Sequence, residues 1–454
     1  MPDLSSSFSQ LLCAQGVVCY LLQYAIRTMQ GSGGSINRGA LVRFFNSVLL
    51  LSSCMAVNTW PFSLGVENIS DTILQSLRGS ESKPAAVGLV TNQTGCDQQG
   101  QRTVDILCQK GVRISYILAP EHGFDGKAPA GKPIEDAIDA KTSIPIMSVY
   151  GRGGDYSIKG KRFDPVIMKQ IDLICYDLQD VGMRHYTYIS TLLLALEAAA
   201  EHDKPIVVFD RPNLLGPHME GPTVDPDPAI RSFISLVSIP LRHGMTVGEL
   251  ATYFNKHILK KQAKLQVVKM AKYQRNELTR SFKELSPNLK TISSCYGYSF
   301  LGILGEVGPF DVGVGTAQAF QAILLPDTIR VPAHTWARLR SLLETYEIRS
   351  THHALIKRNQ QYSGLRLHFS NIMQTASFGL LLDLLQFFKK AGVALSFSNL
   401  FDKAMGTSLV RKLYTENGSR QQLNHHTKKG LAQFMKQAHD SFLYEPLPRV
   451  VLPI

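Results

Sequence analysis

The segment VRISYILAPEHGFDG, residues 112–126, decides the fold that the sequence predicts. Its first part is mostly apolar, with several β-branched residues, and it stops at Pro120. A run of this kind is typical of a strand that is buried on both faces of a sheet. Glu121 and His122 follow directly, so the sequence predicts a carboxylate and an imidazole at the carboxyl end of a strand over residues 112–120. The two side chains are either a polar turn or part of a functional site.

Further apolar runs alternate with stretches of helical spacing. Strands are predicted within residues 85–95, 171–180 and 204–213, and helices within residues 103–111 and 188–204. This alternation favours a parallel sheet that is covered on both faces. We therefore expect an α/β fold with a Rossmann-like, doubly wound parallel sheet over residues 66–245, without the GxGxxG dinucleotide motif. A second, smaller mixed α/β domain is expected over residues 246–454, beginning at a capping box of Thr246 and Glu249.

The composition excludes several classes of function. Hydrophobic residues make up 44% of the 454 residues and charged residues 19%, which is typical of a globular protein. The net charge is +12, but the basic residues are scattered, and the densest cluster, residues 256–264, fits a solvated helix face. We expect no nucleic-acid partner. The seven cysteines form no CxxC pair, so neither a zinc site nor a thiol-redox site is expected. No other metal and no cofactor is expected either.

The first 60 residues have the pattern of a targeting segment. Arg38 and Arg43 precede a short apolar stretch, and small residues then lead to Cys54. This order is typical of a secretory signal, and Leu51–Cys54 also resembles the site at which a bacterial lipoprotein is cleaved and acylated. We expect an exported protein, either in the periplasm or anchored to a membrane by a lipid on Cys54. A buried or interfacial helix is the alternative for this segment.

Polar side chains gather where the predicted strands end. Ligands of an open parallel sheet bind beyond the carboxyl ends of its strands. The four ends carry Asn92; Glu121 and His122; Asp177, Asp180, Arg184 and Tyr186; and Asp210, Arg211, Asn213 and Glu220. Any one of these could be a cap or a turn residue, but four polar strand ends together favour a site. Paired carboxylates suit glycoside cleavage, in which one acid protonates the leaving oxygen and a second residue activates water or attacks.

Several motifs make the chain similar to a known family. They are GLVTNQTG, APEHGFDG, YDLQDVGMRHYTY, FDRPN, EGPTVD, IPLRHGMTVGELA and SPNLKT, in this order within residues 68–316. Together they resemble the exo-acting β-N-acetylmuramidases, which cleave a terminal N-acetylmuramic acid from peptidoglycan fragments. The resemblance implies a hydrolase of cell-wall recycling whose active site lies in a cleft between a Rossmann-like domain and a smaller α/β domain. Peptidoglycan fragments are the partner it implies.

The resemblance also implies roles for individual residues. Glu121 matches the acid of the PEHG motif and is the expected general acid, and Asp177 or Asp180 is the expected second carboxylate. Arg184 and Arg211 are the candidates for binding the lactyl carboxylate of muramic acid, since a guanidinium matches a carboxylate bidentately. The other candidates for substrate binding are Asn92, His122, Tyr186, Asp210, Asn213, Glu220, His243 and Glu306.

The chain departs from the family pattern near residue 310. Where the family carries a segment similar to FEGTNLSEGRGT, this chain reads LGEVGPFDVGVGT. Glu306 is retained, but Val312 stands where an acid is expected and Val314 where an arginine is expected. A lost charged pair in the cleft leaves a second hypothesis open, a cell-wall lipoprotein that binds a glycan without cleaving it. A cytoplasmic nucleotide or phosphate enzyme is a third, weaker hypothesis.

Overall fold

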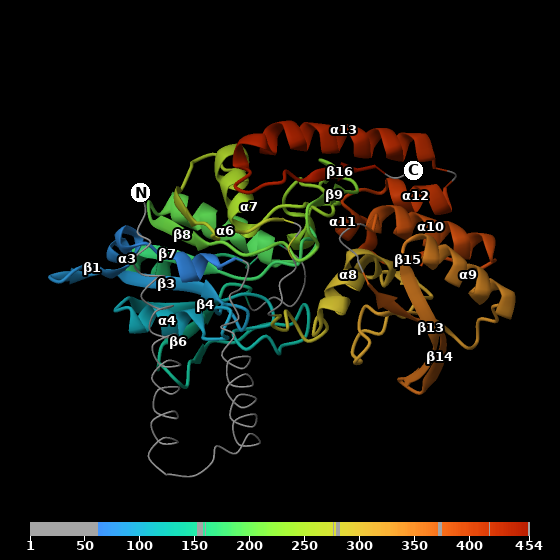
Figure 1. Ribbon diagram of the computed structural model, residues 1–454, viewed down its shortest axis with the longest axis horizontal. Helices are drawn as coiled ribbons and strands as arrows, with labels where there is room; N and C mark the ends of the chain where they lie inside the picture. Colours follow the sequence, from blue (N-terminus) through green and yellow to red (C-terminus); the bar gives the residue numbers. More distant parts are fainter. Residues whose placement is uncertain are drawn as a thin grey trace, which may run out of the picture. The chain divides into compact units, whose positions relative to one another are not determined.

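A seven-stranded sheet forms the first part of the fold (Figure 1). The computed structural model describes residues 62–151, 158, 160–275, 277, 282–370, 375–416 and 418–452, and the predicted targeting segment with Cys54 lies outside them. In spatial order the strands are β10 (Lys264–Val268), β8 (Pro205–Phe209), β7 (Leu173–Asp177), β3 (Ala86–Thr91), β4 (Arg113–Ala119), β6 (Pro145–Ser148) and β5 (Ala137–Ile138). All neighbours are parallel except β5 and β6.

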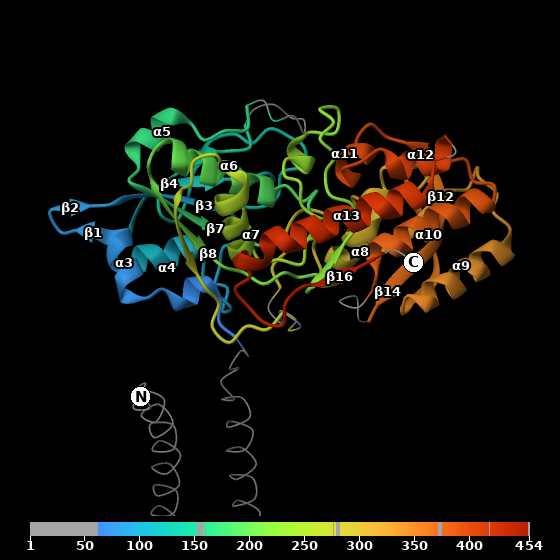
Figure 2. The same ribbon diagram turned by 90° about the horizontal axis from the view of Figure 1, so that it is seen from above.

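Side chains of the central strands enter two hydrophobic cores, one on each face of the sheet. Along β7, Leu173 and Cys175 join one core and Ile174 and Tyr176 the other, because successive side chains of a strand point to opposite faces. The helices over the sheet are α3 (Asp71–Arg78), α4 (Thr103–Gln109), α5 (Pro165–Gln170), α6 (Tyr188–Glu201) and α7 (Val247–Tyr253). Figure 2 shows α3 and α4 on one side and α5 and α6 on the other. The prediction of a doubly wound parallel sheet is confirmed.

The rest of the chain builds a mixed α/β region, as expected. Its antiparallel sheet has the order β12 (Ala322–Pro326), β14 (Gln360–Phe369) and β13 (Ile348–Lys357), and β11 (Val307–Gly308) pairs with β15 (Ser396–Phe397). Its helices are α8 (Ile292–Leu304), α9 (Ala333–Thr345), α10 (Ser377–Lys390), α11 (Phe401–Met405), α12 (Leu409–Thr415) and α13 (Arg420–Ala438). The short elements of the whole chain are η1 (Gly65–Asn68), β1 (Gly79–Ser80), β2 (Lys83–Pro84), η2 (Phe233–Ser235), the π-helical turn η3 (Phe254–Ile258) and η5 (His439–Ser441).

The two parts are interleaved along the chain. β10 lies in the first sheet although it comes after residue 246, where the second domain was expected to begin, so that boundary stays a prediction. At the other end, β16 (Arg449–Val451) returns to pair in parallel with β9 (His218–Glu220), and Figure 1 shows these strands beside each other below α13. The described residues from Phe62 onward form one compact unit. No helix within the described ranges is long and apolar enough to cross a bilayer.

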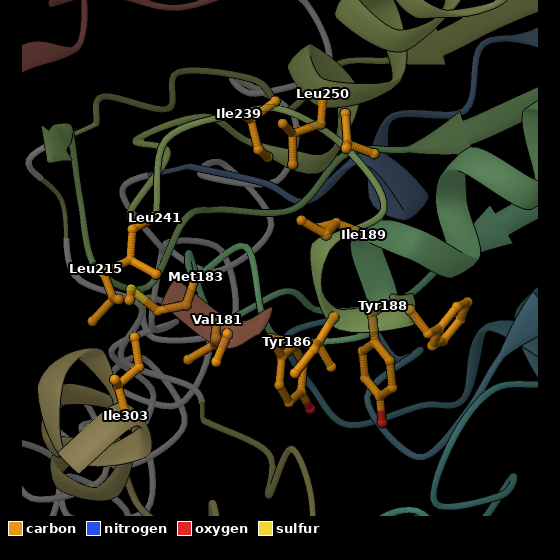
Figure 3. Packing of buried hydrophobic residues seen from close by; sticks show 14 of the residues in the cluster. Val181, Met183, Tyr186, Tyr188, Ile189, Leu215, Ile239, Leu241, Leu250 and Ile303 are labelled. Atoms are coloured by element: carbon orange, nitrogen blue, oxygen red, sulfur yellow. The ribbon is translucent and has the colours of Figure 1, made fainter. Parts of the chain in front are cut away.

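Apolar packing fixes the loop between β7 and α6, which carries the longest of the sequence motifs. Val181 and Met183 from this loop are fully buried and belong to the same core as Ile303 of α8. Figure 3 shows them close to Leu215 and Leu241, two further members of that core. The loop is therefore set rigidly between the sheet and the helix α8.

Candidate active site

A cavity of about 350 Å³ lies where loops of the first sheet meet the mixed α/β region. Glu121 and His122 line it from the loop after β4, and Tyr186 lines it from the loop before α6. The opposite wall comes from α8, from Glu306 and the segment that follows it, and from Lys357 at the end of β13. Its volume lies within the range of roughly 300–1,000 Å³ that is usual for small-molecule sites.

Glu121 is buried, with 3% of its surface exposed, and three hydrogen bonds fix its carboxyl group. Oε1 accepts from the backbone N–H of Gly131 at 2.7 Å and from the hydroxyl of Tyr150 at 3.2 Å. Oε2 accepts from the Thr187 hydroxyl at 2.6 Å. A hydroxyl can accept as well as donate, so the same position accommodates the protonated acid, with its proton on Oε2. The carboxyl group is therefore held in one position in the cavity wall.

His122 ends the strand segment with a sharp change of backbone direction. Its φ is 70°, in the left-handed region that few side chains adopt, and Gly123 follows with a φ of 79°. The ring Nδ1 lies 2.7 Å from the carbonyl oxygen of Ala128. Because a carbonyl only accepts, Nδ1 is the donor of this hydrogen bond. His122 thus stabilises the loop and belongs to the cavity wall.

Asp177 forms a buried ion pair instead of lining the cavity. It is fully buried, and its Oδ2 accepts from the guanidinium of Arg211 at 2.8 Å and also from the Thr103 hydroxyl. Arg211 additionally donates to the carbonyl of Cys96. The pair joins the loops that follow β7 and β8. The predicted catalytic role of Asp177 and the predicted lactyl-binding role of Arg211 stay predictions, and the geometry gives them no support.

Asp180 and His243 form a second buried pair away from the cavity wall. Oδ2 of Asp180 accepts from the backbone N–H of Gly182 at 2.6 Å and lies 3.1 Å from Nε2 of His243. Nδ1 of His243 accepts from the backbone N–H of Met245, so Nε2 is the donor to Asp180. The contacts are those of a pair that fixes the loop after β7.

The remaining predicted residues outside the cavity wall also make structural contacts. Arg184 is buried and donates to the carbonyls of Pro222, Ile239 and Ala404, and burial lowers its pKa to about 9. The other four residues form hydrogen bonds within loops and caps. Asn92 bonds to Tyr188 and Thr94, and Asn213 bonds to Met245 and Leu215. Asp210 accepts from Arg211, Thr246, Gly248 and Tyr444, and Glu220 accepts from Arg242 and from the first N–H groups of α10. Their side chains hold loops together in this structure.

Two further predicted residues do line the cavity with Glu121 and His122. Tyr186 donates through its hydroxyl to the carbonyl of Leu285 at 3.1 Å, and its ring centroid lies 6.0 Å from that of Tyr298. Glu306 is half-buried and accepts from the Ser398 hydroxyl at 2.5 Å. Glu306 was predicted as a binding residue, and this role stays a prediction; the structure places it as a second carboxylate in the same cavity as Glu121.

Sequence reasoning assigned no role to His185, Asp311 or Lys357, although all three line the cavity. His185 lies inside a recognised motif, between Arg184 and Tyr186, and this position was the available signal. Asp311 and Lys357 carry no local signal, because they are 46 residues apart in the chain and meet only in the fold. The described residues contain no group of three or more His, Cys, Asp or Glu side chains that could hold a metal ion.

The chain is similar to known proteins over most of its length. Two family models, exo-β-N-acetylmuramidase NamZ N-terminal and C-terminal, match residues 87–293 and 296–444. The peptidoglycan β-N-acetylmuramidase NamZ of Bacillus subtilis (strain 168) is 36% identical over 302 residues, which are 64% of this chain and 70% of that protein. A DUF1343 family protein from Bacteroides fragilis has a crystal structure with a TM-score of 0.73 and 28% identity, over 85% of this chain and 99% of that one. A second such protein, with a TM-score of 0.65 and 24% identity, shares the fold.

Proposed function

This chain belongs to the exo-β-N-acetylmuramidase NamZ family and is a glycoside hydrolase of peptidoglycan, and we propose that Glu121 is its general acid. In the proposed reaction it releases terminal N-acetylmuramic acid from peptidoglycan fragments. One observation carries the role of Glu121: of the three carboxylates predicted to be catalytic, Glu121 is the one that lines the cavity. It is also buried, and three hydrogen bonds hold its carboxyl group in position, as general acid catalysis requires of the side chain that transfers the proton.

The proposed reaction breaks the bond between the anomeric carbon and the glycosidic oxygen. Glu121 transfers its proton to that oxygen, which leaves with the rest of the glycan. Water then adds to the anomeric carbon and gives one of its protons to a carboxylate of the cavity, which balances the proton that Glu121 lost. Charge that develops on the sugar ring needs a second carboxylate. Glu306 supports this role better than Asp177 or Asp180, because it shares the cavity with Glu121 and the two aspartates do not line it.

The cavity wall also supports a sugar as the occupant. Tyr186 and Tyr298 offer aromatic surface for a sugar face, and both line the cavity. His185 lies in the same wall, and neither of its ring nitrogens has a hydrogen-bond partner in the described part of the chain. An acetamido group has one N–H and one carbonyl oxygen, which matches the one acceptor and one donor of a neutral imidazole.

The test compares Glu121→Gln with the wild type on a chromogenic β-glycoside of N-acetylmuramic acid. We expect a loss of about 10²–10⁴-fold in kcat, the usual contribution of general acid catalysis, with an unchanged melting temperature. Glu135→Gln is the matched control, because Glu135 is exposed and does not line the cavity. Full activity in Glu121→Gln would assign the proton transfer to another residue.

We also propose that the enzyme is exported and anchored through an acylated Cys54. The order of basic, apolar and small residues before Cys54 supports this, and so does a substrate that belongs to the cell wall. One acyl chain gives only marginal membrane binding, so other contacts with the membrane must add to the lipid on Cys54. Cell fractionation should find the wild type with the membranes and Cys54→Ser in the soluble fraction. Equal distribution of both proteins would contradict the anchor.

A further inference from the structure

We propose that Lys357, held in place by Asp311, binds the lactyl carboxylate that distinguishes N-acetylmuramic acid from N-acetylglucosamine. The proposal rests on the proposed function and names the residue that selects the sugar. Lys357 ends β13, and its Nζ lies 2.6 Å from Oδ2 of Asp311. Both side chains line the cavity that holds Glu121, and they keep 26% and 12% of their surface exposed.

Lys357 supplies the cation that the cavity needs. Within the described part of the chain, it is the one lysine or arginine that lines this wall. The cavity already contains the carboxyl groups of Glu121, Glu306 and Asp311, which would repel an anionic sugar unless a positive charge lay beside its carboxylate. An ammonium has three N–H donors, and a bond to Asp311 leaves two of them for a carboxylate of the substrate.

The two arginines that were expected to bind the lactyl group are committed elsewhere. Arg184 donates to three backbone carbonyls, and Arg211 is paired with Asp177 and the carbonyl of Cys96. Freeing either guanidinium would leave buried polar groups without partners, which is costly. Lys357 needs no such rearrangement, because it already lies in the cavity.

Asp311 is the positioning residue for Lys357. Its backbone N–H and carbonyl both pair with Leu324 of β12 at 3.0 Å, and its Oδ1 accepts from the N–H of Gly313 at 2.7 Å. The carboxylate is therefore fixed, and it orients the ammonium of Lys357. This pair also replaces the charged pair that the family pattern places at positions 312 and 314. The acid stands one residue before Val312, and the cation comes from β13 instead of position 314.

The experiment measures kcat/KM on matched chromogenic β-glycosides of N-acetylmuramic acid and N-acetylglucosamine. Lys357→Met removes the charge and keeps the aliphatic stem, and we expect it to lower the preference for muramic acid at least about tenfold, through KM. Lys357→Arg should retain most of the preference. Asp311→Asn should raise KM for the muramic acid glycoside more than it lowers kcat, as a positioning residue would. Lys260→Met, at an exposed lysine outside the cavity, is the control.

A second measurement applies if the N-acetylglucosamine glycoside is cleaved too slowly for its kcat/KM to be measured. The inhibition constants of free N-acetylmuramic acid and free N-acetylglucosamine should differ in the wild type, and Lys357→Met should bring them together. If the active wild type and Lys357→Met discriminate equally, the inference is wrong while the proposed function stands. If the wild type releases nothing from the muramic acid glycoside, the proposed function itself fails.

Discussion

At the scale of single residues, His185 is a histidine that the fold keeps neutral. Burial, together with the positive charge of Arg184, lowers its pKa to about 3. Both ring nitrogens lack a hydrogen-bond partner among the described atoms, and the ring lies in the wall of the cavity. A buried polar group without a partner raises the free energy of the protein. A ligand that forms a hydrogen bond with this group therefore gains binding free energy.

We therefore expect His185→Phe, which keeps an aromatic ring and removes both nitrogens, to raise KM for the muramic acid glycoside about tenfold. That factor corresponds to roughly 1.4 kcal/mol of binding free energy, about one hydrogen bond. Because the imidazole is neutral throughout pH 4–8, the shape of the pH profile of kcat/KM should be the same in both proteins. Steady-state kinetics across this range provides the measurement. Loss of one limb of the profile in His185→Phe would show that the imidazole titrates during catalysis.

The same lowered pKa predicts how stability depends on pH. The pKa of His185 is 6.5 in the unfolded chain and about 3 in the fold, so between these values the unfolded state binds more protons. The free energy of unfolding should then decrease as the pH falls from 6.5, by roughly 1 kcal/mol per pH unit from this group. Urea titrations at pH 7 and pH 4.5 should show a smaller decrease for His185→Phe than for the wild type. Equal decreases would contradict the lowered pKa.

At the scale of elements, the pair of Asp177 and Arg211 connects the carboxyl ends of β7 and β8. We expect Arg211→Met to lower the free energy of unfolding by about 3–5 kcal/mol, because it leaves a buried carboxylate without its partner. Removing both charges, in Asp177→Asn with Arg211→Met, should recover part of that loss. Denaturant titration measures both. The kcat of the folded fraction should change little. A large loss of kcat at unchanged stability would instead support a catalytic role for Asp177 and Arg211.

The elements themselves could largely be predicted from the sequence. The strand predicted over 112–120 is β4, Arg113–Ala119, and the predicted helix over 188–204 is α6, Tyr188–Glu201. The capping box of Thr246 and Glu249 is also confirmed. Continuous apolar runs and caps are local signals, so they specify local structure well.

The composition of the cavity wall could be predicted only in part. Polar residues at strand ends identify the right edge of the sheet, but they do not say which way each side chain turns. Asp177 turns to Arg211 and Asn92 to Tyr188, whereas Glu121 lines the cavity. The opposite wall comes from segments for which the sequence predicted no site, and contacts such as that of Asp311 with Lys357 depend on the complete fold.

At the scale of the whole molecule, the C-terminal segment ties the second part of the chain to the first sheet. β16 pairs with β9, and the backbone N–H of Leu443 donates to Glu249 on α7. The hydroxyl of Tyr444 donates to Oδ2 of Asp210 at 2.6 Å and accepts from the N–H of Met270. Asp210 follows β8 directly, and burial raises its pKa to about 6. These contacts predict that residues 62–454 unfold as one cooperative unit.

The prediction can be tested with Tyr444→Phe, which removes one donor from a buried carboxylate. We expect a decrease of about 1–3 kcal/mol in the free energy of unfolding, the cost of leaving a buried acceptor short of a partner. The whole transition should shift, with the same midpoint by fluorescence and by circular dichroism, because Asp210 and Tyr444 join distant parts of one unit. Lys256→Met is the control, since Lys256 and Asp440 form an exposed ion pair between similarly distant segments, and such pairs contribute about 0–1 kcal/mol. Two separate transitions, with only one of them moved by Tyr444→Phe, would mean that the first sheet and the C-terminal region unfold independently.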